Sequence, residues 1–471
     1  MLQPFATAIA ANRFGLGARP GDLAHIGSDP VGWLDDQLTG SAPVVSGEGL
    51  RPSEAIISES LRLRDQLREA KRSAPGKQGD AAALQAAVTK LPQFFRPIYV
   101  AEATARFQQA LSTDRPFVER LTQFWTNHFA VSVDKIAVLG VAGALEREAI
   151  RPHVLGKFTD LLLAVEQHPA MLLYLDNYLS VGPNSRVAAP RGLRPVRRQL
   201  GINENLAREI LELHTLGVGG GYTQADVTIF AEVITGWSIG GERGRLFSAG
   251  DPGRFVFRPD IHEPGTKVVL GKRYPDNEHG QGVAVLHDLA SHPSTARFIA
   301  TKLARHFIAD DPPPAVVDRL AKTFLSTGGD LPAVYRALIT CAEAWANPLS
   351  KYKTPSDYIV SSFRGLDLPI VNERAVLAPF ELLGQRTYSP GSPAGWPDKS
   401  ADWDGASALM KRIEWADAVG QRVGSKRDAA GLAPQLLGET LTTATRTSIA
   451  RAASGAQALT LLLAAPEFMR R

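Results

Sequence analysis

Apolar residues recur at the spacing of an α-helix along most of this 471-residue chain. The clearest stretch is 115–131, where the large apolar side chains share one helical face: Phe117, Leu121, Phe124, Trp125 and Phe129. The period is lost over about 244–275, where FVF and KVVL lie between glycine-rich turns typical of short strands. The sequence therefore predicts a mainly α, multi-helical fold with a small β-rich insertion around residues 244–275.

The composition indicates one large globular unit. Hydrophobic residues make up 44% of the chain and charged residues 21%, which excludes a disordered chain. The length allows a large core built from closely packed parts. Within a single unit spanning 1–471, we expect a peripheral helical hairpin at 54–90, a helical core with the main motifs at 96–240, the β-rich insertion at 241–290 and a C-terminal helical part at 291–471.

Charge, cysteine usage and hydropathy exclude several classes of protein. The formal net charge of +4 is too small to indicate nucleic-acid binding by itself. Cys341 is the single cysteine, which excludes an internal disulfide and a cysteine-based zinc site. No apolar run approaches the ~18 residues of a membrane span. The N-terminus lacks a secretory signal pattern, so we expect a soluble, cytoplasmic protein as written, or an exported one if the N-terminus has been trimmed.

The densest polar set lies on a predicted helix over 203–216. Four polar side chains form a strip along one face of this helix: Asn205, Arg208, Glu209 and Glu212. One interpretation is a solvated face with Glu–Arg pairs at i,i+4 spacing. The other is a pair of carboxylates, held by the arginine, that faces a cleft. That spacing suits metal binding or one acid with its orienting partner, because a glycosidase pair must flank the bond from opposite sides.

Several polar residues fall on helical faces that are otherwise apolar. His128 shares the face of Phe124 and Trp125, and a lone histidine of this kind is more often a hydrogen-bonded core residue. Lys302 and His306 share the apolar face of a helix over 293–309. A buried lysine needs a partner, and Asp226 or a glutamate of the strip is the candidate.

Two further polar segments have structural as well as functional interpretations. Thr223 and Asp226 have the spacing of a capping box, and Asp176 ends a helix where a turn or cap is common. The stretch 186–198 carries five arginines, two prolines and no acid. We expect it to be partly exposed beside the N-terminus of the 203–216 helix, where both would favour an anion.

Seven segments carry a specific resemblance to a known family. They are FWTNHF at 124–129, RPHVLGKFTDLLLAVEQHPAMLLYLDN at 151–177, GINENLAREILELHTLGVGGGYTQADV at 201–227, TGW at 235–237, HEPGTKVVLG at 262–271, HPSTARFIATKLARHF at 292–307 and LGQRTYSPGSPAGWP near the C-terminus. The chain closely resembles the bacterial domain-of-unknown-function family DUF 1800 along nearly its whole length. The 54–90 segment resembles it least, and Glu263 replaces the aspartate that the family usually shows.

The resemblance implies which polar residues form a site. Its polar signature matches Asn127, His128, Asp176, Asn177, Asn205, Arg208, Glu209, Glu212, His214, Asp226, His262 and Lys302. As catalytic groups we expect Glu209, Glu212, His128 and Asp226. As substrate-binding groups we expect Asn127, Arg208, His262, Lys302, Asp176, Asn205, Arg197 and Arg198. The glutamates and Arg208 should face a concave pocket that also receives His128 and His262.

Three functions remain open at this point. The first is a hydrolase that uses carboxylate and histidine acid–base chemistry on a polysaccharide or another polyhydroxylated or anionic substrate, with a divalent metal at Glu209, Glu212 and a histidine as one variant. The second is a non-catalytic helical binding or assembly module with a partner protein, which predicts an exposed apolar patch and an internally paired strip. Nucleic-acid binding through 186–198 ranks last, because no aromatic residue is near.

Overall fold

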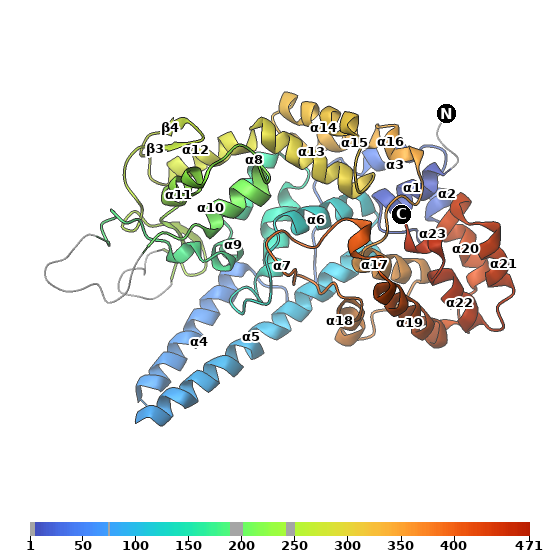
Figure 1. Ribbon diagram of the computed structural model, residues 1–471. Coiled ribbons are helices and arrows are strands. Elements are labelled where there is room, and N and C mark those ends of the chain that lie inside the picture. Colours follow the sequence, from blue (N-terminus) through green and yellow to red (C-terminus); the bar gives the residue numbers. More distant parts are fainter. Residues whose placement is uncertain (1–4, 74–75, 189–200, 242–249) are drawn as a thin grey trace.

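The computed structural model describes residues 5–73, 76–188, 201–241 and 250–471 (Figure 1). In these ranges it contains 23 α-helices and two small two-stranded sheets. The predicted mainly α fold with a small β-rich insertion is therefore confirmed. No helix of the described residues has both the length and the apolar character needed to cross a membrane.

The first helices of the chain gather around the π-helix η1, which packs against a buried helix, α6. They are α1 (Ala6–Ile9), the π-helix η1 (Ala10–Phe14), α2 (Asp22–Ile26) and α3 (Pro30–Asp36), and α6 spans Pro116–His128. The predicted apolar face of α6 is buried. Its Trp125 is fully buried and donates its indole N–H to the hydroxyl of Tyr335 at 2.6 Å. A large aromatic side chain in the core thus keeps its one polar atom satisfied.

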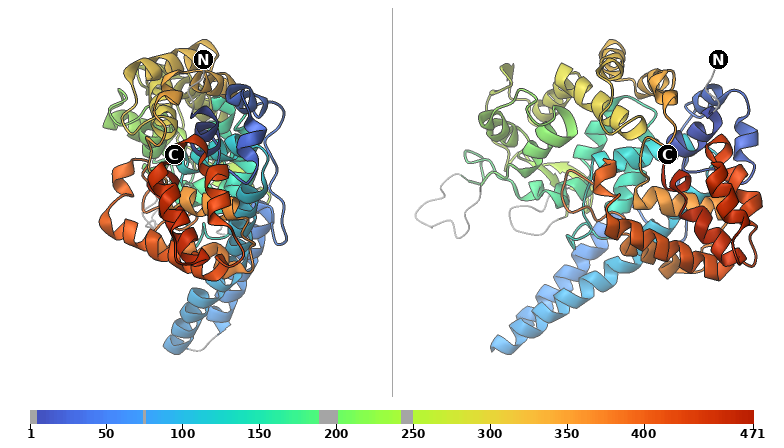
Figure 2. Two further views of the ribbon diagram at one scale, coloured as in Figure 1. Left: turned by 90° about the vertical axis from the view of Figure 1, so that its right-hand side faces the viewer. Right: turned by 45° about the vertical axis from the view of Figure 1, so that its right-hand side comes forward.

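A pair of long helices, α4 (Ser53–Ser73) and α5 (Gly76–Ser112), projects from the rest of the molecule. Figures 1 and 2 show it as an arm that leaves the body on one side. The predicted hairpin at 54–90 is present, and α5 continues well beyond residue 90. Its C-terminal part packs against α7, α17 and α18, so the arm is anchored in the body at its base.

The part of the helical core that follows α6 consists of short helices. They are α7 (Ala142–Leu145), the π-helix η2 (Glu146–Ile150), the 3₁₀ turn η3 (Arg151–His153), α8 (Phe158–Glu166), α9 (Pro169–Tyr174), the 3₁₀ turn η4 (Asn177–Leu179), α10 (Asn205–Glu209), the π-helix η5 (Ile210–Thr215) and α11 (Gln224–Val233). The predicted helix over 203–216 is present as α10 and η5. Its second half is a π-helix, in which the N–H of Leu216 bonds the carbonyl of Leu211 at 3.0 Å.

The β-rich insertion consists of two antiparallel hairpin-like pairs. Strand β1 (Trp237–Ile239) pairs with β2 (Phe255–Phe257), and β3 (Lys267–Val269) pairs with β4 (Lys272–Tyr274). The predicted range of 244–275 was too narrow, because β1 begins directly after α11. Gly236 makes this early start feasible: its φ of +87° lets the chain leave the helix in a conformation that favours glycine.

The C-terminal half returns to helices, as predicted. These are α12 (His279–Ala290), α13 (Pro293–Phe307), α14 (Pro314–Ser326), α15 (Leu331–Ile339), α16 (Glu343–Ala346), α17 (Pro355–Leu366), α18 (Glu373–Leu382), the 3₁₀ turn η6 (Ser400–Asp402), α19 (Ala406–Val423), α20 (Ala429–Leu437), the 3₁₀ turn η7 (Gly438–Thr440), α21 (Thr443–Ala450), α22 (Gly455–Leu463) and α23 (Pro466–Met469). The loop of residues 383–405 joins α18 to α19 and passes beside α6, where it is hydrogen-bonded to Asn127. We call it the α18–α19 loop.

Candidate functional site

A pocket of about 340 Å³ lies between α6, α13, the start of α17 and the α18–α19 loop. We call it the α6–α13 pocket. Three of the segments that line it also carry the family resemblance: FWTNHF, HPSTARFIATKLARHF and LGQRTYSPGSPAGWP. Segments that are distant in the sequence therefore meet at one concave surface with several polar side chains, which is the usual form of a small-molecule site.

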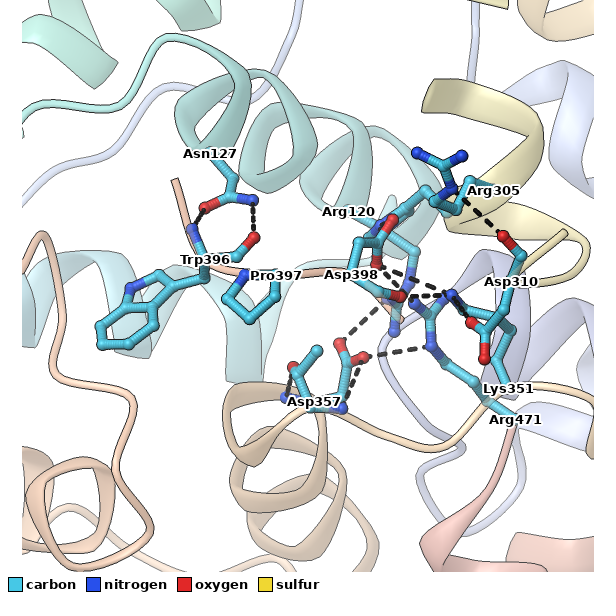
Figure 3. Close-up of polar contacts among 12 residues, drawn as sticks. Arg120, Asn127, Arg305, Asp310, Lys351, Asp357, Trp396, Pro397, Asp398 and Arg471 are labelled. Carbon is cyan, nitrogen blue, oxygen red and sulfur yellow. Dashed lines mark hydrogen bonds and ion pairs between the residues drawn. The ribbon is translucent and has the colours of Figure 1, made fainter. Parts of the chain in front are cut away.

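Asn127 fixes the α18–α19 loop to the end of α6. Its side-chain amide donates to the carbonyl of Trp396 at 2.9 Å and accepts from the Trp396 N–H at 2.7 Å (Figure 3). Both ends of the amide are thus engaged by the backbone. Asn127 was predicted to bind substrate, and it does line the pocket, but its amide is occupied in holding the loop that forms one wall.

His306 and Asp398 form a paired acid–base group in the pocket lining. The imidazole Nδ1 lies 3.1 Å from each carboxylate oxygen of Asp398. Burial would raise the pKa of Asp398, but His306, Lys351 and Arg471 outweigh it and hold that pKa at about 2. Burial lowers the pKa of His306 and outweighs the opposing effect of Asp398. The carboxylate is therefore ionised and the imidazole neutral near pH 7, so Nδ1 carries the proton and Nε2 a lone pair.

The Nε2 atom of His306 has no hydrogen-bond partner in the part of the chain that the structure describes, and it is buried. The side chain itself is 15% exposed and lines the α6–α13 pocket. Phe124 packs against the ring with the two ring centroids 5.4 Å apart. This nitrogen is therefore an acceptor without a partner, on a ring held in place by an ion and an aromatic side chain.

A network of ions beneath the pocket holds Asp398 in position (Figure 3). Arg120 and Arg471 both pair with Asp357, at 2.9 Å and 3.1 Å. Lys351 pairs with Asp310 at 2.6 Å and donates to the backbone carbonyl of Asp398. Asp357 is 7% exposed and Arg120 2%, so their charges are stabilised by one another rather than by water. The network makes the floor of the pocket rigid.

Lys302 lies one helical turn before His306 and lines the same pocket. It is half-buried, and among the described residues no ion pair joins it to the candidate partners Asp226, Glu209 or Glu212. Its ammonium lies 5.6 Å from the centroid of the Phe298 ring. Burial lowers the pKa of Lys302 to about 8, against a smaller raising effect of Asp398. A salt bridge was predicted for a buried Lys302, and α13 instead turns this side chain into the pocket, where it is half-buried, so the condition of that prediction is not met.

His128 also lines the pocket, from the last turn of α6. Its Nε2 lies 3.1 Å from the backbone carbonyl oxygen of His214 in η5. Because a carbonyl only accepts, Nε2 carries the proton, and Nδ1 is left without a partner among the described residues. Burial lowers the pKa of His128 well below its usual value, and the charge of Lys302 acts in the same direction. His128 is thus a neutral imidazole next to a cation.

The predicted strip of α10 and η5 does not line the α6–α13 pocket. Arg208 pairs with Glu204 at 2.8 Å, which is the i,i+4 pair of the solvated-face interpretation. Glu209 is half-buried, and burial raises its pKa. Glu212 and Asn205 likewise lie outside the pocket. The helix contacts the pocket lining through His214, whose carbonyl bonds His128 and whose ring packs against Phe129. The catalytic roles expected for the two glutamates stay predictions.

Asp226 and Asp176 have structural partners. One oxygen of Asp226 accepts from the Thr223 N–H at 2.9 Å and the other from the Leu270 N–H at 2.7 Å. The predicted capping box is therefore confirmed, and the same carboxylate ties α11 to the β3–β4 turn. Asp176 pairs with Lys135 at 2.6 Å and has a φ of 57°. Both carboxylates lie outside the pocket.

His262 lies in the β-rich insertion rather than in the pocket with His128. Its Nδ1 lies 2.9 Å from the carbonyl of Thr235, and its Nε2 lies 4.0 Å from Asp276. The neighbouring Glu263 accepts from the backbone and side chain of Asn184. These contacts join the insertion to the segment after η4. Arg197 and Arg198, with most of the 186–198 stretch, lie outside the described residues.

Sequence reasoning missed the pair His306–Asp398 and the ion network below it. His306 was assigned to an apolar helical face, and its spacing of four from Lys302 already placed both on one side of α13. Asp398 follows directly after the GWP of the last segment that resembles the family. Arg120 gave no signal, because its partner Asp357 is 237 positions away and only the fold brings them together.

No group of three or more histidine, cysteine, aspartate or glutamate side chains within the described ranges is arranged to hold a metal ion. The ligand set of Glu209, Glu212 and a histidine is accordingly not assembled there.

Comparison with known proteins identifies a family but no named relative. A search of curated proteins and a search of solved structures both find no match. The family model described as "Protein of unknown function (DUF1800)" matches residues 9–470, which is nearly the whole chain. Since the match includes every segment that forms the α6–α13 pocket, the chain belongs to the DUF1800 family.

Proposed function

We propose that this protein is a hydrolase whose substrate binds in the α6–α13 pocket and whose general base is His306. The observation that carries the proposal is the contact of the His306 Nδ1 with Asp398, which leaves Nε2 as an acceptor without a partner in the described part of the chain. The acid–base role expected for Glu209 and Glu212 passes in this proposal to His306 and Asp398.

In the proposed reaction, the Nε2 of His306 takes a proton from a water molecule as that water attacks the substrate. Asp398 keeps the imidazole in the required tautomer and stabilises the imidazolium that forms. The imidazolium then returns the proton to the leaving group. The rigid ion network under Asp398 favours this role, because a base must be held within hydrogen-bond reach of the reacting proton.

The lining of the pocket favours an anionic or polyhydroxylated substrate. Its cationic side chains are Arg106, Arg120, Lys302, Arg305, Arg386 and Lys399. Four of them pair with carboxylates, whereas Lys302 and Arg305 have no ion pair among the described residues and are left to bind an anion. Gln123, Gln385 and Thr387 add neutral hydrogen-bonding groups of the kind that bind hydroxyls, and Trp396 adds an aromatic surface. A sugar unit of a polysaccharide or a small organic acid ester fits both features.

The experiment is a panel of nitrophenyl glycosides, esters and phosphates, assayed with the wild type, His306→Gln and His287→Gln. His287 is an exposed histidine of α12 and serves as the matched control. We expect turnover of at least one class, a loss of about 10²–10⁴-fold in His306→Gln, and wild-type activity in His287→Gln. Equal activity of the two variants, or no turnover of any class, would contradict the proposal.

One observation favours the non-catalytic alternative. A groove of about 620 Å³ between α18 and α19 is lined mainly by apolar side chains, among them Val371 and Leu382, which are 54% and 45% exposed. Exposed apolar surface of this kind can bind a partner protein. This function predicts that Leu382→Glu removes partner binding, whereas His306→Gln does not.

A further inference from the structure

The amine of Lys302 has surroundings that the proposed hydrolysis does not require. It lies in the α6–α13 pocket with the Phe298 ring on one side and the neutral His128 nearby, and it has no ion pair among the described residues. A lysine in this setting is poorly solvated as an ammonium, so its neutral amine is more populated than that of an exposed lysine. The neutral amine is a nucleophile.

We propose that Lys302 forms a covalent imine with an aldehyde or ketone that carries an anionic group. The pocket supplies what such a step needs. Arg305, a lining cation without an ion pair among the described residues, attracts an anionic substituent. His306 lies one turn along α13 on the same side as Lys302, and its buried Nε2 has no hydrogen-bond partner among the described residues. This activity goes beyond hydrolysis and does not depend on it.

The atoms and electrons of the step balance as follows. The lone pair of the Lys302 nitrogen attacks the carbonyl carbon, a C–N bond forms, and the carbonyl electron pair moves to oxygen. His306 accepts a proton from the nitrogen and returns it to the oxygen, which gives a carbinolamine. The remaining N–H proton then passes through His306 to that hydroxyl, which leaves as water. The nitrogen lone pair forms the C=N bond, and the electron pair of the broken N–H bond becomes the lone pair of the imine. No oxidant or reductant is consumed.

A second lysine, Lys353, serves as a control that distinguishes two causes of reactivity: a position in the pocket and a lowered pKa. Lys353 is buried and its pKa is lowered to about 7, mainly by burial. Its ammonium nitrogen donates to the hydroxyl of Ser361 at 3.1 Å, and it does not line the α6–α13 pocket. If low basicity alone decided reactivity, Lys353 would react at least as well as Lys302. If the pocket decides it, only Lys302 reacts.

The test uses the wild-type protein with glyoxylate and cyanoborohydride, which reduces an imine to a stable carboxymethyl amine. Peptide mass mapping then gives the rate of modification at each lysine. We expect Lys302 to be modified at least about tenfold faster than the exposed Lys322 of α14 and than Lys353. A rate at Lys302 equal to or below that of Lys322 overturns the proposal, as does equal labelling of Lys302 and Lys353.

A variant links the labelling to the proposed proton transfer. His306→Gln should slow the labelling of Lys302 and leave that of Lys322 unchanged. If Lys302 is labelled at the same rate in the variant as in the wild type, His306 does not transfer the proton in this step. Because labelling is read without any hydrolysis assay, an inactive panel of nitrophenyl substrates with rapid labelling of Lys302 would reject only the hydrolase. Active hydrolysis without preferential labelling would reject only the imine.

Discussion

The imidazole of His128 and the backbone carbonyl of His214 are joined by a hydrogen bond of 3.1 Å. This bond connects the last turn of α6 to the π-helix η5. It is also where the helix of the predicted polar strip meets the α6–α13 pocket. The strip helix therefore contributes a main-chain atom that fixes the tautomer of a pocket histidine, while its glutamates lie elsewhere.

The acid limb of the activity should report the lowered pKa of His306. Because burial lowers that pKa, the imidazole stays neutral and basic to a pH below the ordinary value of about 6.5. We expect kcat/KM to fall only below that pH as the base becomes protonated. Asp398→Asn should lower kcat/KM by about 10²–10⁴-fold, since the amide can no longer hold the tautomer. A pH–rate profile checks the first expectation, and an acid limb centred above 6.5 contradicts it.

Replacing Lys302 by methionine should not destabilise the fold. The substitution removes a half-buried cation that has no carboxylate partner among the described residues and keeps a similar apolar volume. We expect the free energy of unfolding at pH 7 to stay the same or rise by up to about 2 kcal/mol. The folded pKa of about 8 lies below that of an unfolded lysine, so the wild type should gain stability as the pH rises from 8 towards 10.5. Urea unfolding of both proteins at pH 7 and 10 tests this, and a large loss of stability in Lys302→Met would reveal a hidden partner.

Glu146 should make the protein acid-sensitive. It is 1% exposed and pairs with Arg106 at 2.7 Å and Arg151 at 2.8 Å. Burial would raise its pKa, but the two arginines outweigh it and hold that pKa at about 2. The stabilisation is therefore complete above the unfolded value of about 4.3 and is lost as the pH falls through 2.

Glu146→Gln tests that expectation directly. Near neutral pH it should lower the free energy of unfolding by about 3–5 kcal/mol, because two buried guanidinium groups lose a shared partner. Between pH 5 and 2 its stability should fall less steeply than that of the wild type. Parallel pH profiles for the two proteins would show that Glu146 does not titrate as described.

Gly395 should be intolerant of a side chain. Its φ is +82°, and a Cβ there would lie 2.3 Å from the backbone oxygen of Asn127. Gly384 has a similar φ of +84° but open space around the added Cβ, which makes Gly384→Ala a matched control. We expect Gly384→Ala to cost about 1 kcal/mol for the backbone conformation alone. Gly395→Ala should cost clearly more and reduce activity, and equal losses would mean that the loop adjusts freely.

Local features of the fold could be predicted from the sequence because they depend on neighbouring residues. The face of α6, the capping box at Asp226 and the hairpin of α4 and α5 follow from periodicity, side-chain chemistry and helix breakers. The early start of β1 could not be predicted in this way, since it depends on where α11 ends.

The sequence predicted some of the residues that line the pocket and not others, for a physical reason. Asn127, His128 and Lys302 line it, whereas Glu209 and Glu212 lie outside it, and the roles expected of all five stay predictions. Helical spacing shows which residues share a face, and it does not show what that face meets. His306 and Asp398 are 92 positions apart, and the pairing of an imidazole with a distant carboxylate leaves no periodic trace.

The π-helix at Ile210–Thr215 makes the pocket depend on the length of the chain there. A π-helix spends an extra residue on each turn relative to an α-helix, and Leu216 closes such a turn onto Leu211. Deleting one residue between 210 and 215 would let the segment tighten into an ordinary α-helix and change the direction in which its last carbonyls point. The carbonyl of His214 would then move out of line with His128 although every amino acid of the pocket was retained. In this part of the molecule a change of length is thus more disruptive than a change of identity.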